Sequence, residues 1–191
     1  TLWPANNGIF LTDGARWLRL RTPGPLAERD AALLALFAYS RQDFPAKDWP
    51  RDVLATSLAI QDDSIFESSA HYFAYIVAFD EGNLAAAEGH ILRSREMMET
   101  LSPTFALPLV LESAFVLAWR GEDLDEARRL RSSLGEKPLG VDEASLRRLD
   151  AVIALRESDI DAAKRLLDQV NLGPNVAPKC LARSNVRPCR T

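Results

Sequence analysis

The amino-acid sequence predicts an all-α fold built from stacked antiparallel helical hairpins. Apolar residues recur at the helical spacing through most of the 191-residue chain. One kind of turn, an Asn or Asp followed by Leu or Ile, occurs three times. The Leu or Ile positions of these turns, Leu84, Leu124 and Ile160, lie 40 and 36 residues apart. Such spacing is typical of helical repeats of about 34 residues joined by variable outer loops.

Composition limits the size and class of the molecule. With 47% hydrophobic and 26% charged residues, the chain is typical of a globular protein that can form one sizeable helical core. The net charge is −4, and residues 171–191 hold four bases and no acid, so the rest of the chain carries −8. This balance argues against nucleic acid as the main partner, because phosphate binding needs a concentrated basic face.

Residues 1–25 are predicted to form a separate segment, because Pro, Asn and Gly interrupt it repeatedly. Only residues 15–21 can form a short helix there. In that stretch Trp17, Leu18 and Leu20 alternate with three arginines. The alternation suits a membrane interface, where aromatic rings and the stems of basic side chains are stable. A polar surface turn around a buried tryptophan fits the same pattern.

Two helices are expected next, at residues 26–41 and 53–60. The first has an apolar face of leucines and Phe37, preceded by acids that suit the first turn of a helix. Proline-containing pairs at 44–45 and 49–50 mark the loop between the two helices.

Three helical hairpins follow, at about residues 64–100, 104–135 and 142–170. An Asn or Asp at each inner turn can cap the second helix, and a small alanine four residues later lets the two helices approach closely. The aligned turn positions are Asn83, Asp123 and Asp159, followed by Ala87, Ala127 and Ala163. The first helices align through Ala78, Ala118 and Ala154.

The turn sequences GNLAAA, EDLDEA and SDIDAA resemble the Gly-Asp-Tyr-x-x-Ala turn of tetratricopeptide repeats. The resemblance covers about residues 64–170. It implies a right-handed array whose first helices line a concave face. The chain departs from the family pattern where Tyr75 and Phe115 hold a position that is usually Gly or Ala.

A concave face of this kind predicts a protein or peptide partner, bound through an apolar segment or helix. The alternative is that the same side chains form the core. The residues assigned to the partner-binding groove are Tyr72, Ile76, Phe79, Glu112, Val116, Trp119, Arg120 and Val152, with Leu109 and Leu155 on the same face.

The repeat region contains no recognisable catalytic motif. His71 and His90 are the only histidines and lack the HExxH spacing, so both are expected to pack in the fold or face solvent. Cys180 and Cys189 have no second cysteine pair or nearby histidine to complete a zinc site, and are expected to be reduced, exposed thiols. No cofactor is therefore expected within this chain.

Residues 2–16 carry the most specific chemical pattern, Leu-Trp-Pro followed by GIFLTDGAR at residues 8–16. This stretch resembles the C-terminal zinc-ligand motif of site-2-protease-like membrane metallopeptidases, particularly bacterial members whose Asp-Gly-Ala-Arg leads into a soluble helical domain. The resemblance implies that Asp13 is the third zinc ligand of a parent protein, beside two histidines of an upstream HExxH helix. Zinc would acidify a bound water there, and the HExxH glutamate would act as general base. An ordinary Asp-Gly turn is the alternative.

We therefore expect three parts: a metal-site remnant and juxtamembrane segment at 1–25, a helical-repeat domain at 26–170, and a flexible basic tail at 171–191. The first residue, Thr1, is consistent with a C-terminal piece of a longer protein. The expected function is non-catalytic: a cytoplasmic interaction domain, at the inner face of a membrane that only upstream segments would reach. It would bind or position a partner or substrate of a site-2-protease-like metallopeptidase.

Two other functions fit the sequence. One is a stand-alone tetratricopeptide-like adaptor without a protease connection. The other is a small-molecule-binding domain that uses Tyr72, Phe79 and Trp119. Under the preferred interpretation, purified residues 1–191 hydrolyse no peptide and bind no zinc tightly.

Overall fold

The computed structural model describes residues 12–42, 44–136 and 138–171, and within these it is all-α. Residues 1–11 and the basic tail with Cys180 and Cys189 lie outside the described residues. The described elements are α1 (Asp13–Arg21), α2 (Pro25–Ser40), the short 3-10 helix η1 (Ala46–Asp48), α3 (Arg51–Leu58), α4 (Ile65–Asp80), α5 (Leu84–Leu101), α6 (Pro103–Arg120), α7 (Leu124–Leu134), α8 (Glu143–Arg156) and α9 (Ile160–Asn171). The helices predicted from periodicity are all present within a few residues of their expected bounds.

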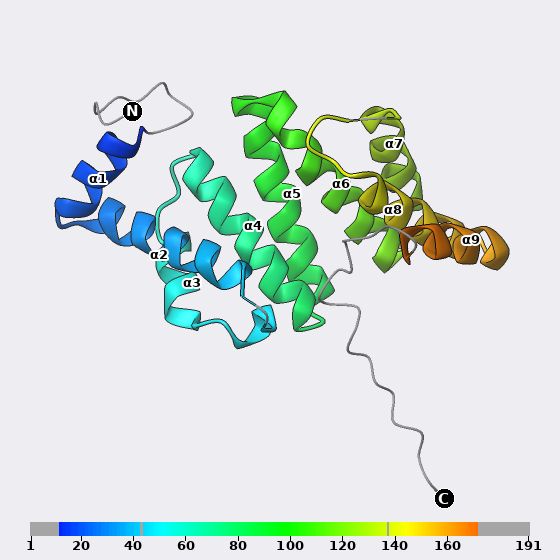
Figure 1. Cartoon of the computed structure of the whole chain (residues 1–191), viewed down its shortest axis with the longest axis horizontal. Coiled ribbons are helices and arrows are strands. Elements are labelled where there is room, and N and C mark those ends of the chain that lie inside the picture. The colour runs from blue at the N-terminus through cyan, green and yellow to red at the C-terminus, as the bar shows by residue number, and fades with distance from the viewer. Residues whose placement is uncertain (1–11, 43, 137, 172–191) are drawn as a thin grey trace, which may run out of the picture.

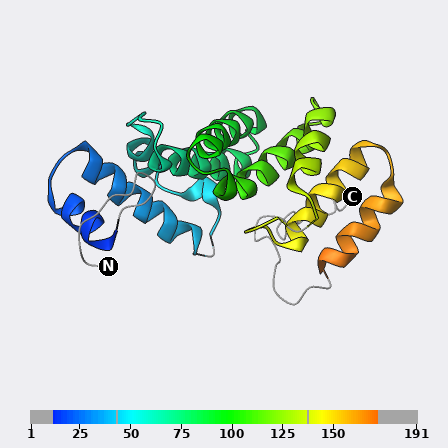
Figure 2. The ribbon, with the colours of Figure 1, turned by 90° about the horizontal axis from the view of Figure 1, so that it is seen from above.

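The helices succeed one another along the long axis of the molecule, from α1 at one end to α9 at the other (Figure 1). Seen from above, they follow an arc whose two ends curve to the same side (Figure 2). Consecutive helices pack together as α4 with α5, α6 with α7 and α8 with α9, and each pair is joined by a short inner turn. Helix α5 also packs on α6, and α6 packs on α8, which links the three pairs.

The predicted caps are present at all three inner turns. Asn83 accepts a hydrogen bond from the backbone N–H of Ala86 at 3.3 Å. Asp123 and Asp159 accept equivalent bonds at 2.9 Å. Each side chain satisfies a backbone donor that the first turn of a helix leaves unpaired. The starts of α5, α7 and α9 are thus determined locally.

The three inner turns each contain three residues, but the left-handed residue of the middle turn occupies a different position. Gly82 and Ser158 directly precede their capping residues and have φ values of 77° and 66°. In the middle hairpin the left-handed residue is Gly121, with φ of 76°, which lies two positions before Asp123. A left-handed residue ends each first helix, and Ser158 adopts this conformation without the freedom of glycine.

Two apolar clusters make up the core. The smaller joins α2, the α2–α3 connection and α4, and includes Leu36, Trp49 and Phe73. The larger extends from α4 to α8 and contains the aligned alanines Ala87, Ala118 and Ala127, each fully buried. The alanines therefore lie where the helices approach closely, as predicted. Helix α4 contributes to both clusters, so the core is continuous across the molecule.

Helix α1 is attached to the helical body. Arg19 Nη1 lies 3.3 Å from Oδ2 of the buried Asp30 on α2, and the Arg19 guanidinium lies over the ring of Phe66 on α4 at 5.3 Å. Helix α1, which lies within the segment expected at residues 1–25, thus packs on α2 and contacts Phe66 of α4. Trp17 is 58% exposed, which excludes the alternative of a buried tryptophan.

Among the residues with described positions, no helix has the length and apolarity needed to cross a membrane.

Candidate functional site

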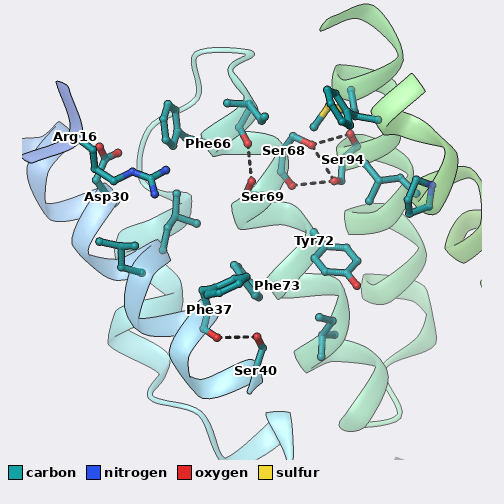
Figure 3. Close-up of a pocket in the computed structure, with 18 residues that line it drawn as sticks. Arg16, Asp30, Phe37, Ser40, Phe66, Ser68, Ser69, Tyr72, Phe73 and Ser94 are labelled. Carbon is teal, nitrogen blue, oxygen red and sulfur yellow. Dashed lines mark hydrogen bonds between the residues drawn. The ribbon is translucent and has the colours of Figure 1, made fainter. Parts of the chain in front are cut away.

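A hollow of about 900 Å³ opens between α2, α4 and α6, and we call it the α2–α4–α6 groove. Its base is formed by α4, with Phe66, Tyr72 and Phe73 projecting into it (Figure 3). The other lining residues are Arg16, Asp30, Leu33, Leu34, Phe37 and Ser40 before α4; Ile65, Ser68, Ser69 and Ile76 on α4; and Ser94, Met98, Phe105, Pro108 and Leu109 after it.

Large apolar side chains remain exposed at the edges of the groove. Phe37 on α2 is 56% exposed, and Phe105 on α6 is 54% exposed. Exposed phenylalanines on two different helices, with an apolar hollow between them, form a patch that water solvates poorly. Burying these rings against a ligand would be favourable by roughly 25 cal/mol for each Å² of apolar surface removed from water.

Three serine hydroxyls in the wall are already bonded within the protein. Ser68 Oγ donates to the carbonyl of Ser94 at 3.0 Å, and Ser94 Oγ donates to the carbonyl of Ser68 at 2.8 Å. Ser69 Oγ donates to the carbonyl of Ile65 at 2.7 Å. Because these hydroxyls are satisfied, the groove offers mainly apolar contact and shape to a ligand.

Tyr72 is a neutral group at the base of the groove. Burial, with the nearby Glu112 carboxylate as the second cause, raises the pKa of Tyr72 to about 12. At neutral pH the phenol therefore keeps its proton and can donate a hydrogen bond to a ligand.

The structure brings only part of the predicted groove together. Tyr72, Ile76 and Leu109, which were assigned to the predicted face, line the hollow. Phe79 and Trp119 instead form an aromatic cluster with Phe115, in which the Phe115 and Trp119 rings stack with centroids 5.8 Å apart. Phe79 and Trp119 do not line the groove, although Phe79 connects to the groove residue Tyr72 through the Tyr75 ring.

Four other residues assigned to the groove have structural roles. Val116 on α6 and Val152 on α8 are buried in the larger core cluster, because α6 and α8 pack against each other. Glu112 accepts hydrogen bonds from Tyr75 and Arg148 at 2.7 Å each. Arg120 pairs with Glu88 and Glu122 at 2.6 and 2.5 Å. For the two valines, the alternative of core packing was right.

Sequence reasoning missed the contribution of α2 and of the start of α6. Leu34 and Phe37 were identified on an apolar helix face, but that face was not assigned to a site. The sequence did contain an indication of this, because residues 31–39 are all apolar. A helix with only one buried face would have polar residues on its other side. Phe105 lies at the start of α6, outside the repeat positions that the turn alignment identified.

The described residues contain no group of three or more side chains suited to hold a metal ion. Asp13 is the first residue of α1, one residue after the N-cap Thr12, and its carboxylate lies in the first turn of that helix. His71 Nδ1 and His90 Nδ1 lie 2.9 Å apart, so one ring donates a hydrogen bond to the other. Burial lowers the pKa of both histidines, which favours the neutral pair.

Comparison with known proteins supplies no relative for this chain. No family model, no curated protein and no solved structure matches it. A function must therefore be argued from the groove and from the sequence patterns alone.

Proposed function

We propose that this chain is a helical-repeat interaction domain that binds an apolar or amphipathic segment of a protein partner in the α2–α4–α6 groove. The observation that carries the proposal is the exposure of Phe37 on α2 and Phe105 on α6, both of which line a hollow of about 900 Å³. Amphipathic helices are recognised in apolar grooves of this kind through anchor side chains spaced three or four residues apart.

The chemistry of the wall favours a protein segment over a small molecule. A small-ligand site combines apolar walls with a few convergent polar groups that fix the orientation of the ligand. Here Ser68, Ser69 and Ser94 are bonded to the protein itself, and Asp30 is paired with Arg19. A peptide does not need these groups, because its own helix satisfies its backbone.

The tetratricopeptide-like array remains part of the proposal. It is supported by three consecutive helix pairs with capped inner turns and by buried alanines at the aligned positions. In this arrangement α2, α4 and α6 present the partner-binding face, which lies nearer the N-terminus than the turn alignment predicted.

The connection to a site-2-protease-like metallopeptidase stays a prediction from residues 2–16. Asp13 belongs to no metal-binding group among the described residues, so a zinc site would need ligands from outside them. In that context the domain would position a partner or substrate of the protease. An upstream HExxH helix in the coding sequence would support this role, and a start codon just before Thr1 would leave the stand-alone adaptor.

Peptide display can test the groove directly. Helical peptides with randomised apolar faces would be selected against purified residues 1–191, and the affinity of the winners measured against Phe37→Glu and Phe105→Glu variants. Both rings are more than half exposed, so the substitutions should not unfold the chain. We expect each to weaken binding by roughly tenfold or more, as for anchor residues of interfaces.

Leu155→Glu provides a matched control, since Leu155 is 51% exposed on α8 and does not line the groove. Binding by this variant should equal that of the wild type. Selected peptides that bind all four proteins equally well, or a selection that yields no peptide, would refute the proposed site.

A further inference from the structure

The outer face of α1 exposes large apolar side chains at one end of the molecule. Trp17 and Leu18 are 58% and 52% exposed, and Leu20 is 37% exposed. Leu26, which is 45% exposed, is the second residue of α2, the helix that follows α1 at this end of the molecule (Figure 1). We call these four residues the α1 tip. A tryptophan and three leucines exposed together at one end of the molecule form an apolar patch. Patches of this kind indicate a site of interaction with a partner or a membrane.

The opposite face of α1 is polar and holds the helix in place. Arg19 reaches the buried Asp30 and the Phe66 ring, and Arg16 lines the groove. The helix is therefore amphipathic in an unusual sense, because its ionic face points into the protein and its apolar face points outward. The described residues leave this outer face exposed.

Basic side chains accompany the apolar face. Arg21 lies over the Trp17 ring, with the guanidinium carbon 4.7 Å from the ring centroid. Helix α1 contains three arginines and one acid, Asp13, in a chain whose net charge is −4. Arg19 is paired with Asp30 and Arg16 lines the groove, so Arg21 is the arginine that lies beside the α1 tip. The α1 tip therefore combines exposed apolar side chains with an adjacent positive charge.

We propose that the α1 tip docks on an anionic lipid membrane, with Trp17, Leu18 and Leu20 at the level of the lipid headgroups. Tryptophan and arginine are stable together at this boundary, where the ring is half dehydrated and the guanidinium reaches phosphate. Short helices with exposed apolar residues and flanking bases bind membrane surfaces in this way.

Shape and charge favour a membrane over a protein partner at this position. Helix α1 lies at the outermost end of the arc (Figures 1 and 2). A fluid lipid surface adapts to a protruding helix, whereas a protein partner would need a matching cavity. The negative charge of the remaining chain would be repelled by an anionic surface, which orients the α1 tip toward the lipid.

The inference is independent of the proposed peptide-binding function. Peptides would occupy the α2–α4–α6 groove, whereas lipid would contact the outer face of α1. Substitutions of Phe37 or Phe105 should leave membrane binding unchanged, and substitutions at the α1 tip should leave peptide binding unchanged. Failure of one proposal is therefore distinguishable from failure of the other.

The test is co-sedimentation of purified residues 1–191 with vesicles of phosphatidylcholine alone and of phosphatidylcholine with phosphatidylglycerol. We expect binding to the anionic vesicles, reduced roughly tenfold or more in the double variant Trp17→Ser, Leu18→Ser by loss of two large apolar side chains. Arg21→Gln should weaken binding to anionic vesicles by about fivefold. The matched control is Leu155→Ser, Leu167→Ser, which removes two exposed leucines at the other end of the chain and should bind normally.

Three results would overturn the inference. One is absence of binding to both vesicle types, and another is equal loss of binding in the control double variant. The third is concentration-dependent dimerisation of the wild type in sedimentation velocity, lost in the Trp17→Ser, Leu18→Ser variant while vesicles have no effect. That outcome would show that a second copy of the chain covers the α1 tip. Circular dichroism of each variant would confirm that the helices remain folded.

Discussion

Replacing Glu112 by Gln should destabilise the fold by removing a charge that three helices share. Tyr75 on α4 and Arg148 on α8 both donate to the Glu112 carboxylate on α6, each at 2.7 Å. The Arg148 guanidinium also lies 4.2 Å from the centroid of the Phe115 ring. A glutamine can still accept from one donor, but its amide would then face the other donor and leave Arg148 without its countercharge.

The magnitude follows from burial and charge. Hydrogen bonds to a charged group contribute about 1.5–3 kcal/mol, and both Glu112 and Arg148 are largely but not fully buried. We expect Glu112→Gln to lower the free energy of unfolding by about 2 kcal/mol. For a chain of this size, that loss lowers the melting temperature by roughly 4–8 °C.

Urea unfolding followed by circular dichroism and tryptophan fluorescence would measure the change. Glu143→Gln is the matched control, because Glu143 is exposed and pairs with Arg147 on the same helix, an interaction worth about 0.3–0.5 kcal/mol. A double-mutant cycle with Arg148→Met should give a coupling energy above about 1 kcal/mol. If Glu112→Gln were no more damaging than Glu143→Gln, the carboxylate would not join the helices as described.

Two further predictions concern the core and the histidine pair. Ala118→Leu should cost about 1–3 kcal/mol in chemical unfolding, because Ala118 is fully buried where α6 packs, and an unchanged unfolding curve would place it elsewhere. Burial lowers the pKa of His71 and His90 from 6.5, so the unfolded chain takes up protons first as the pH falls and stability should decline between pH 7.5 and 5.5. Glu67, which favours protonation of His71, and Arg93, which opposes it, face the pair. Urea midpoints across this range should fall for the wild type, and a slope that persists in a His71→Leu, His90→Leu variant would contradict the assignment.

Local features of the chain were predictable because each depends on residues within one helical turn. Asn83, Asp123 and Asp159 mark the starts of three helices through a hydrogen bond to the backbone three residues ahead. Small alanines marked the helix contacts because no larger side chain fits where two backbones approach closely. Even here the alignment did not reveal that the left-handed residue of the middle turn is Gly121, two positions before Asp123.

Which apolar side chains form the core and which form the groove depends on the neighbouring helices. Val116 and Phe105 both lie on α6, yet the first is enclosed by α5, α7 and α8 and the second is more than half exposed. Helix periodicity indicates that one face of a helix is apolar, but it does not indicate whether another helix of the protein covers that face. Glu112 was likewise assigned to the groove from its position on the helix. Its hydrogen bonds to Tyr75 on α4 and Arg148 on α8 depend on tertiary packing, which the sequence does not reveal.

The sequence by itself determined the all-α class, the positions of the helices, their caps and the small residues between them, because these follow from contacts a few residues apart. Only the tertiary structure decided that α2 and α6 enclose a groove over α4, and that Trp17 is exposed on α1. Both depend on the distance and direction between helices that are remote in the chain. That geometry results from packing the whole core and is not encoded in any one segment.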